Sequence, residues 1–190
     1  MGISLYAHLI RCTRIKGIQM HIKRLAALLL CSIFLVSCKS TEIIIKDPFV
    51  VEKKEINGIK QYKKGNYEKA FNLLKEPAAW GYKSSQYTLA FMFLKGNYVQ
   101  QSTVLGMGWL GVAKEAKVKE WTEQYNTFYA AASDKQKHRI DEIVKEYIKR
   151  YGLKSQDVTC RKFINASRRA DIRCHKYEGV GVLYPVDLVE

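Results

Sequence analysis

The chain has 190 residues, a length that suits one ordinary domain with a core and excludes two large domains. Hydrophobic residues make up 47% and charged residues 26%, which excludes a wholly disordered, collagenous or coiled-coil chain. Lys and Arg outnumber Asp and Glu by 32 to 18, for a formal charge of +14. Residues 1–37 contain five basic residues and no acidic one, so this segment differs in character from the rest.

The N-terminal segment has the order of a secretory signal. From Met20 a short basic stretch leads into an apolar run from Leu25 to Val36, which ends just before Cys38. A helix of twelve residues rises only about 18 Å, too short for a hydrocarbon core of roughly 30 Å, so a signal peptide at residues 20–37 is favoured over a membrane span. A buried helix with an ordinary Cys is the other alternative. Residues 1–19 are interpreted as an upstream extension before the true start at Met20, or else as an unusually long n-region.

The end of this segment, Leu35-Val36-Ser37-Cys38, resembles the lipobox of bacterial lipoproteins. The resemblance implies cleavage before Cys38 and acylation of its sulfur and new amino end, and stable attachment requires more than one such chain. In these lipoproteins an Asp after the Cys is the usual signal for retention in the inner membrane. Lys39 therefore implies an outer-membrane protein that faces the periplasm, with residues 38–51 as a lipidated tether.

Only two cysteines remain beyond Cys38, and they flank a polar turn. Cys160 and Cys174 lie in strand-like segments, residues 157–164 and 170–177, and are equally distant from Ser167 at the centre of the turn. In an antiparallel hairpin with this centre they face each other, so an oxidising compartment predicts a Cys160–Cys174 disulfide. The alternative is a metal site that adds His175, but the spacing matches no zinc motif.

Between the tether and this hairpin, apolar residues recur at helical spacing in sets that begin at Tyr67, Tyr87, Leu105, Trp121 and Ile140. Residues 133–136 form a capping box pattern before the last helix, and Gly152 ends it. No strand-like alternation precedes residue 157, and residues 179–181 indicate a flexible turn. The sequence thus predicts an all-α array of about five to six helices in residues 52–152, with a small disulfide-closed β-hairpin and tail in residues 153–190.

Residues 62–74 resemble the opening of a tetratricopeptide or Sel1-like repeat, and residues 86–113 resemble its second helix, glycine loop and next first helix. The resemblance covers about residues 56–116 and includes Gly106, a small residue where two helices can approach. Lys114 and Lys117 depart from the pattern. The family implies a solenoid whose concave face, lined by the helices around residues 53–64 and 105–116, holds a peptide or partner protein. The expected contact residues are Lys60, Gln61, Lys64 and Lys114.

The sequence carries no recognisable catalytic pattern beyond residue 38. Its histidines there are His138 and His175, and no serine-hydrolase motif, phosphate loop or zinc motif is present. The prediction is therefore a protein that is not an enzyme, with no cofactor, no metal and no small-molecule substrate. Basic residues gather on the hairpin, namely Arg161, Lys162, Arg168, Arg169, Arg173 and Lys176.

Export argues against nucleic acid as the partner of these charges and leaves anionic lipid, cell-wall polymer or an acidic protein. Two functions fit the sequence. The first is a lipid-anchored, periplasmic interaction module that acts as an adaptor for an envelope protein or peptide. The alternative is an envelope-structural protein that binds anionic lipid or cell-wall polymer through the hairpin, with Arg168 and Arg169 at its turn.

Overall fold

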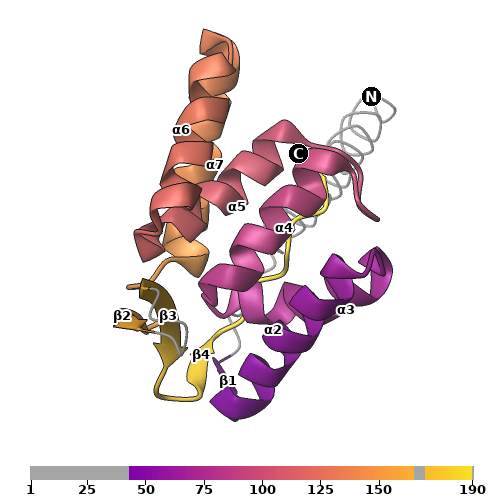
Figure 1. The fold of residues 1–190 in the computed structure, drawn as a ribbon. Helices are drawn as coiled ribbons and strands as arrows, with labels where there is room; N and C mark the ends of the chain where they lie inside the picture. The colour runs from indigo at the N-terminus through magenta and orange to yellow at the C-terminus, as the bar shows by residue number, and fades with distance from the viewer. Residues whose placement is uncertain (1–42, 165–169, 190) are drawn as a thin grey trace, which may run out of the picture. The chain divides into compact units, whose positions relative to one another are not determined.

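The computed structural model describes residues 43–164 and 170–189, which belong to one folded unit (Figure 1). The described elements are β1 (Ile43–Ile45), α2 (Pro48–Lys63), α3 (Tyr67–Ala79), α4 (Lys83–Lys95), α5 (Thr103–Ala113), the 3₁₀ helix η1 (Lys114–Ala116), α6 (Lys119–Ala131), α7 (Asp134–Tyr151), β2 (Val158–Ile164), β3 (Ala170–Lys176) and β4 (Val180–Val182). The predicted class, mostly helical with a small hairpin, is confirmed for these residues. The repeat relation between the helices stays a prediction.

Local sequence signals set several of the helix ends. Asp47 caps α2 by accepting a hydrogen bond from the Phe49 amide, and Pro48 occupies the first helical turn, where its missing N–H costs nothing. The predicted capping box of α7 is confirmed, because Ser133 and Gln136 exchange side-chain to backbone hydrogen bonds. Gly96 ends α4 in the left-handed conformation that glycine tolerates best.

Helix α5 lies at the centre of the array, between α4 and α7 (Figure 1). Glycines permit this close packing: a Cβ on Gly106 would stand 2.6 Å from Cγ of Leu94 in α4, and one on Gly111 would stand 2.4 Å from Cγ2 of Val144 in α7. The close approach expected at Gly106 is therefore confirmed. Every residue from Val104 to Ala113 is buried, so the expectation that α5 lines an open concave face is wrong.

The two ends of the folded unit pair with each other. Residues 43–45 and 180–182 form an antiparallel two-stranded sheet, although the sequence predicted a tether for the first segment and a flexible turn for the second. Strands of three residues are too short to show an alternating pattern. Helix α2 likewise begins at Pro48, inside the predicted tether.

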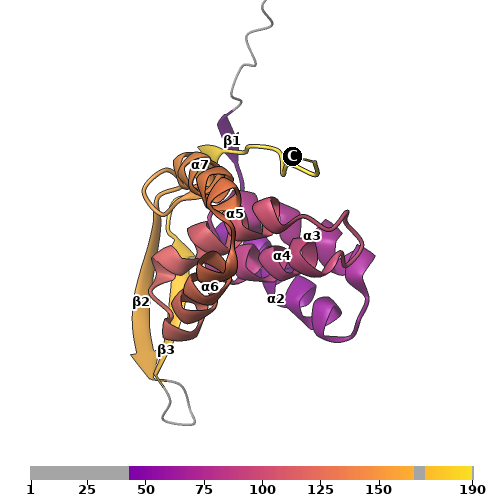
Figure 2. The same cartoon turned by 90° about the horizontal axis from the view of Figure 1, so that it is seen from above.

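The segment after β4 returns to the helices. Leu183, Tyr184 and Val186 pack against the main hydrophobic core, and the Tyr151 hydroxyl donates a hydrogen bond of 2.6 Å to the carbonyl oxygen of Pro185. Residues 183–189 therefore belong with the helical domain, and the β2–β3 hairpin projects at the edge of the helices (Figure 2).

Candidate functional site

The hairpin has the register that the sequence predicts. Cys160 lies directly opposite Cys174 in the antiparallel pair, and their sulfurs are 2.09 Å apart, the distance of a disulfide bond. Cysteines joined in this way are not thiolate ligands, so the geometry favours the predicted disulfide over the alternative metal site with His175. Within residues 43–164 and 170–189, no group of three or more His, Cys, Asp and Glu is placed to hold a metal ion.

The basic residues of the hairpin divide into two sets. Arg161, Lys162 and Arg173 are exposed, and the Arg173 guanidinium lies 4.2 Å from the centre of the Phe163 ring. Lys176 does not join this surface, contrary to the sequence interpretation: it is 3% exposed, lies over Trp80 and donates a hydrogen bond to the carbonyl oxygen of Gln156. Arg168 and Arg169 lie outside the described residues.

A polar pocket of about 320 Å³ lies beside the disulfide and is lined by residues of α2, α4 and β3, among them Glu55, Arg173, Cys174 and His175. One carboxylate oxygen of Glu55 accepts hydrogen bonds from the Ser85 amide at 2.9 Å and the Ser85 hydroxyl at 3.0 Å. Burial outweighs these hydrogen bonds and raises the pKa of Glu55 to about 7. This side chain therefore changes charge near neutral pH.

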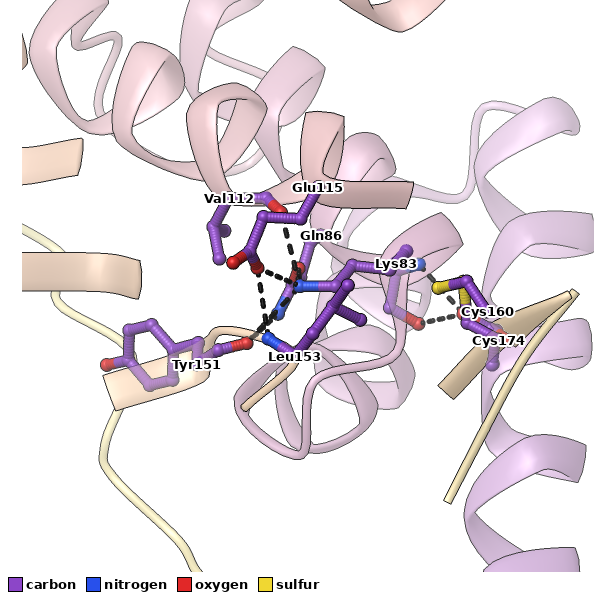
Figure 3. Close-up of a disulfide and its surroundings, with 10 residues drawn as sticks. Lys83, Gln86, Val112, Glu115, Tyr151, Leu153, Cys160 and Cys174 are labelled. Carbon is purple, nitrogen blue, oxygen red and sulfur yellow. Dashed lines mark hydrogen bonds and ion pairs between the residues drawn. A yellow bond between two sulfur atoms is a disulfide. The ribbon is translucent and has the colours of Figure 1, made fainter. Parts of the chain in front are cut away.

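Lys83, at the start of α4, is 1% exposed and also borders this pocket. Its Nζ extends into the domain interior, away from the disulfide (Figure 3). There it donates hydrogen bonds to Glu115 Oε2 at 2.8 Å, Gln86 Oε1 at 3.0 Å and the Val112 carbonyl oxygen at 3.1 Å, with the Tyr151 carbonyl oxygen at 3.5 Å. Burial lowers the pKa of Lys83 to about 8, against the opposing effect of Glu115.

The neighbours of Lys83 extend this network to the ends of three helices. Gln86 Nε2 donates 2.9 Å hydrogen bonds to the carbonyl oxygens of Ala78 in α3 and Tyr151 in α7. Glu115 Oε2 also accepts from the Leu153 amide at 3.0 Å. Val112, Ala78 and Tyr151 lie in final helical turns, whose carbonyls have no partner within the helix. Because the Lys83 ammonium is occupied by these acceptors, its arrangement is that of a structural lysine.

The residues expected to contact a partner divide between two surfaces. Lys60 and Lys64 are exposed on α2, while Gln61 is partly buried and accepts a hydrogen bond from Asn66. Lys114 lies instead in a hollow between α5, α6 and α7, with its Nζ 3.7 Å from the centre of the Tyr125 ring. Partial burial lowers the pKa of Lys114. The structure does not gather all four in one groove.

A groove that the sequence did not indicate lies between α3 and the C-terminal segment. Its volume is about 530 Å³, and its lining includes Phe71 and Ala79 of α3 together with Leu183, Val186 and Leu188. Leu188 is 52% exposed at its edge. These residues come from segments more than one hundred positions apart, and residues 183–189 lack a regular period, so no local pattern marked the groove.

Charged side chains stand at the rim of this groove. Lys46 and Lys54 both pair with Glu76, and although burial opposes the effect, their hydrogen bonds hold the pKa of Glu76 below its ordinary value. Lys75, also at the rim, is exposed. Because Lys46 and Lys75 line the groove together with one carboxylate, Glu76, the groove has an excess of positive charge beside its apolar residues.

Cys38 and the apolar run before it lie outside the described residues. In the part of the chain that the structure describes, no helix combines the length and the apolar character needed to cross a membrane. Comparisons with protein-family models, with curated proteins and with solved structures found no match to this chain.

Proposed function

We propose that this protein is a lipid-anchored envelope protein of the bacterial outer membrane that faces the periplasm and acts as a protein–protein interaction module. The helical domain would hold a segment of an envelope partner in the groove between α3 and the C-terminal segment. The groove is the observation that carries the proposal, because it has a volume of about 530 Å³, an apolar lining and lysines at its rim. Such a surface suits an extended peptide with apolar side chains and a flanking acidic residue.

The membrane anchor in this proposal rests on the lipobox-like sequence before Cys38 and on Lys39 after it. The helical-repeat character rests on the residues of α3, α4 and α5 that resemble Sel1-like units. An anchored protein with an interaction groove needs only modest affinity for its partner, because attachment to one membrane raises the effective concentration of both molecules.

Site-specific photo-crosslinking in cells tests the groove. A benzophenone amino acid at position 188, at the edge of the groove, is expected to give a discrete adduct, while the same label at Ile164, exposed on the hairpin, is the control. Lys75→Glu should weaken the adduct because it removes a rim charge, whereas Lys69→Glu, on the exposed side of the same helix and outside the groove, should not. Equal adducts at 188 and 164, or none at 188, would contradict the proposal.

The second candidate is an envelope-structural protein whose hairpin binds anionic lipid or cell-wall polymer. The exposed Arg161, Lys162 and Arg173 favour it. Charge reversal by Arg168→Glu with Arg169→Glu distinguishes the two functions, since it should abolish polymer or lipid binding by the hairpin and leave the adduct at position 188 unchanged. If that adduct disappears with these substitutions, the groove is not an independent site.

A further inference from the structure

The outer face of α2 exposes large apolar side chains to solvent. Phe49 is 70% exposed, Val50 is 50% exposed and Ile56 is 60% exposed. The opposite side of the same helix is buried: Val51 has no exposed surface, and Gly58 lies against Leu74 of α3. One side of α2 therefore supplies the core, while the other holds apolar groups that the domain itself does not cover.

Lysines share this outer face. At 100° per residue, Lys53 and Lys60 fall between the directions of Phe49, Val50 and Ile56, and Lys63 and Lys64 complete the stripe towards the end of the helix. All four lysines are exposed, and none makes an ion pair with a described residue.

One acidic residue, Glu52, flanks this stripe at its edge, about 20° from Lys63 at 100° per residue. The acidic residues of α2 are Glu52 and Glu55, and Glu55 lies on the inner side, where it accepts hydrogen bonds from Ser85. We refer to Phe49, Val50, Lys53, Ile56, Lys60, Lys63 and Lys64 together as the α2 outer face. It combines apolar groups with four positive charges, which outnumber the single carboxylate of Glu52 at its edge.

This combination is the one that binds an anionic lipid surface. Phe and aliphatic side chains insert at the boundary of headgroups and acyl chains, while lysines reach the phosphates, and both contributions act on one face of a helix. The position of α2 in the chain, close to the predicted membrane anchor, is consistent with binding to a lipid surface. Pro48, the first residue of α2, follows Cys38 by ten residues, so the connecting segment reaches at most about 35 Å. Of the described helices, α2 is the nearest in sequence to the apolar run at residues 25–36.

We propose that the α2 outer face docks the helical domain onto anionic phospholipid of the membrane to which its N-terminal segment attaches. Docking fixes which side of the domain points away from the membrane, beyond what a flexible anchor could do. The proposal needs the N-terminal segment to be held at a membrane, either by acylated Cys38 or by the apolar run itself. It does not require a partner in the groove.

The test uses the full chain reconstituted into vesicles, with an environment-sensitive fluorophore on Ile56→Cys and, as the matched control, on Ile164→Cys. Both native residues are exposed and aliphatic, but only Ile56 is in the α2 outer face. In vesicles that contain phosphatidylglycerol, the label at 56 should shift to the blue and be quenched by lipid-borne nitroxides, while the label at 164 should keep its emission in water. Phosphatidylcholine alone should give weaker quenching at 56.

Charge reversal then tests the role of the lysines. Each lysine near an anionic surface favours binding by roughly fivefold. Lys53→Glu with Lys60→Glu should therefore shift the equilibrium of the domain, measured by the label at 56, towards the undocked state by at least about 25-fold. Lys145→Glu with Lys149→Glu, an exposed pair on α7, makes the same change in net charge and should leave quenching at 56 unchanged.

The proposal is overturned if labels at 56 and 164 are quenched equally, if both lysine pairs have the same effect, or if phosphatidylcholine quenches as strongly as phosphatidylglycerol. It is also overturned if the label at 56 shifts without vesicles as protein concentration rises, because the face would then bind a second copy of this chain. The cross-linked adduct at position 188 reports on the groove and does not depend on the α2 outer face. If docking fails while this adduct is still formed, the docking proposal is wrong and the groove proposal stands.

Discussion

Replacement of the buried lysine, Lys83→Met, should destabilise the whole helical domain, because one ammonium group satisfies acceptors from several elements. Methionine has a similar length and keeps most of the packing, but it donates no hydrogen bond. The Glu115 carboxylate, the Gln86 side-chain oxygen and the Val112 carbonyl would each lose a donor within 3.1 Å. The final turn of α5 and the start of α4 would no longer be joined through this side chain.

Two opposing contributions decide the magnitude. Each hydrogen bond to a charged group contributes about 1.5–3 kcal/mol, so the three bonds of the ammonium together contribute on the order of 5–9 kcal/mol, although Glu115 Oε2 keeps the Leu153 amide and the Val112 carbonyl keeps the Lys114 amide as donors. Removing the ammonium also removes its desolvation penalty, and a pKa of about 8 in place of 10.5 corresponds to roughly 3 kcal/mol at neutral pH. The loss of the three hydrogen bonds is the larger contribution, and we expect a net decrease of about 2–6 kcal/mol in the free energy of unfolding at pH 7.

Urea denaturation followed by circular dichroism measures this decrease, with Glu115→Gln as the second half of a double-mutant cycle. A glutamine at 115 still accepts from the Leu153 amide and removes the uncompensated charge, so the double variant should recover at least about 1 kcal/mol relative to additivity. A change below about 0.5 kcal/mol for Lys83→Met, or full additivity in the cycle, would refute the assignment of Lys83 as the centre of the network.

Four further expectations address other parts of the chain. Glu55 has a pKa raised from 4.5 to about 7 in the folded state. Its contribution to the free energy of unfolding is therefore fully present below pH 4.5 and is lost as the pH rises through about 7. Glu55→Gln should remove up to roughly 3 kcal/mol of this pH dependence, measured by denaturation at a series of pH values. Reduction of the Cys160–Cys174 bond, which closes a loop of about 15 residues worth on the order of 3 kcal/mol, should expose the hairpin to protease before the helices; simultaneous cleavage of both would contradict this. Gly111→Ala should cost about 1–3 kcal/mol in thermal or urea unfolding because its Cβ would stand 2.4 Å from a Val144 methyl carbon, and an unchanged midpoint would show that α5 and α7 separate easily. Cys38→Ala should accumulate as an uncleaved precursor without acyl label in metabolic labelling with palmitate, whereas normal processing would exclude the lipoprotein assignment.

Local signals in the sequence were sufficient for helices α3 to α7 and for the β2–β3 hairpin. The apolar spacing within α3 or α7 and the capping box at Ser133 depend on neighbours within a few residues, so they can be read without knowing the fold. The hairpin register followed from a similar local constraint, because a turn predicted from the sequence to centre on residue 167 puts Cys160 opposite Cys174, which is the pairing of β2 and β3 in the structure. Gly106 was also recognisable, since a small residue within an apolar helix signals close packing.

Tertiary structure alone decided where the candidate sites lie. The β1–β4 pair joins segments from opposite ends of the folded unit, and each strand is too short to carry a pattern of its own. Lys83 is of a residue type that is normally exposed, and only the convergence of the ends of α5 and α7 with η1 gives it buried partners. The groove beside Leu188 and the exposed face of α2 depend on which surfaces other elements leave uncovered. That outcome is set by long-range packing, because burial of a residue depends on elements remote in sequence and not on its own neighbours in the chain.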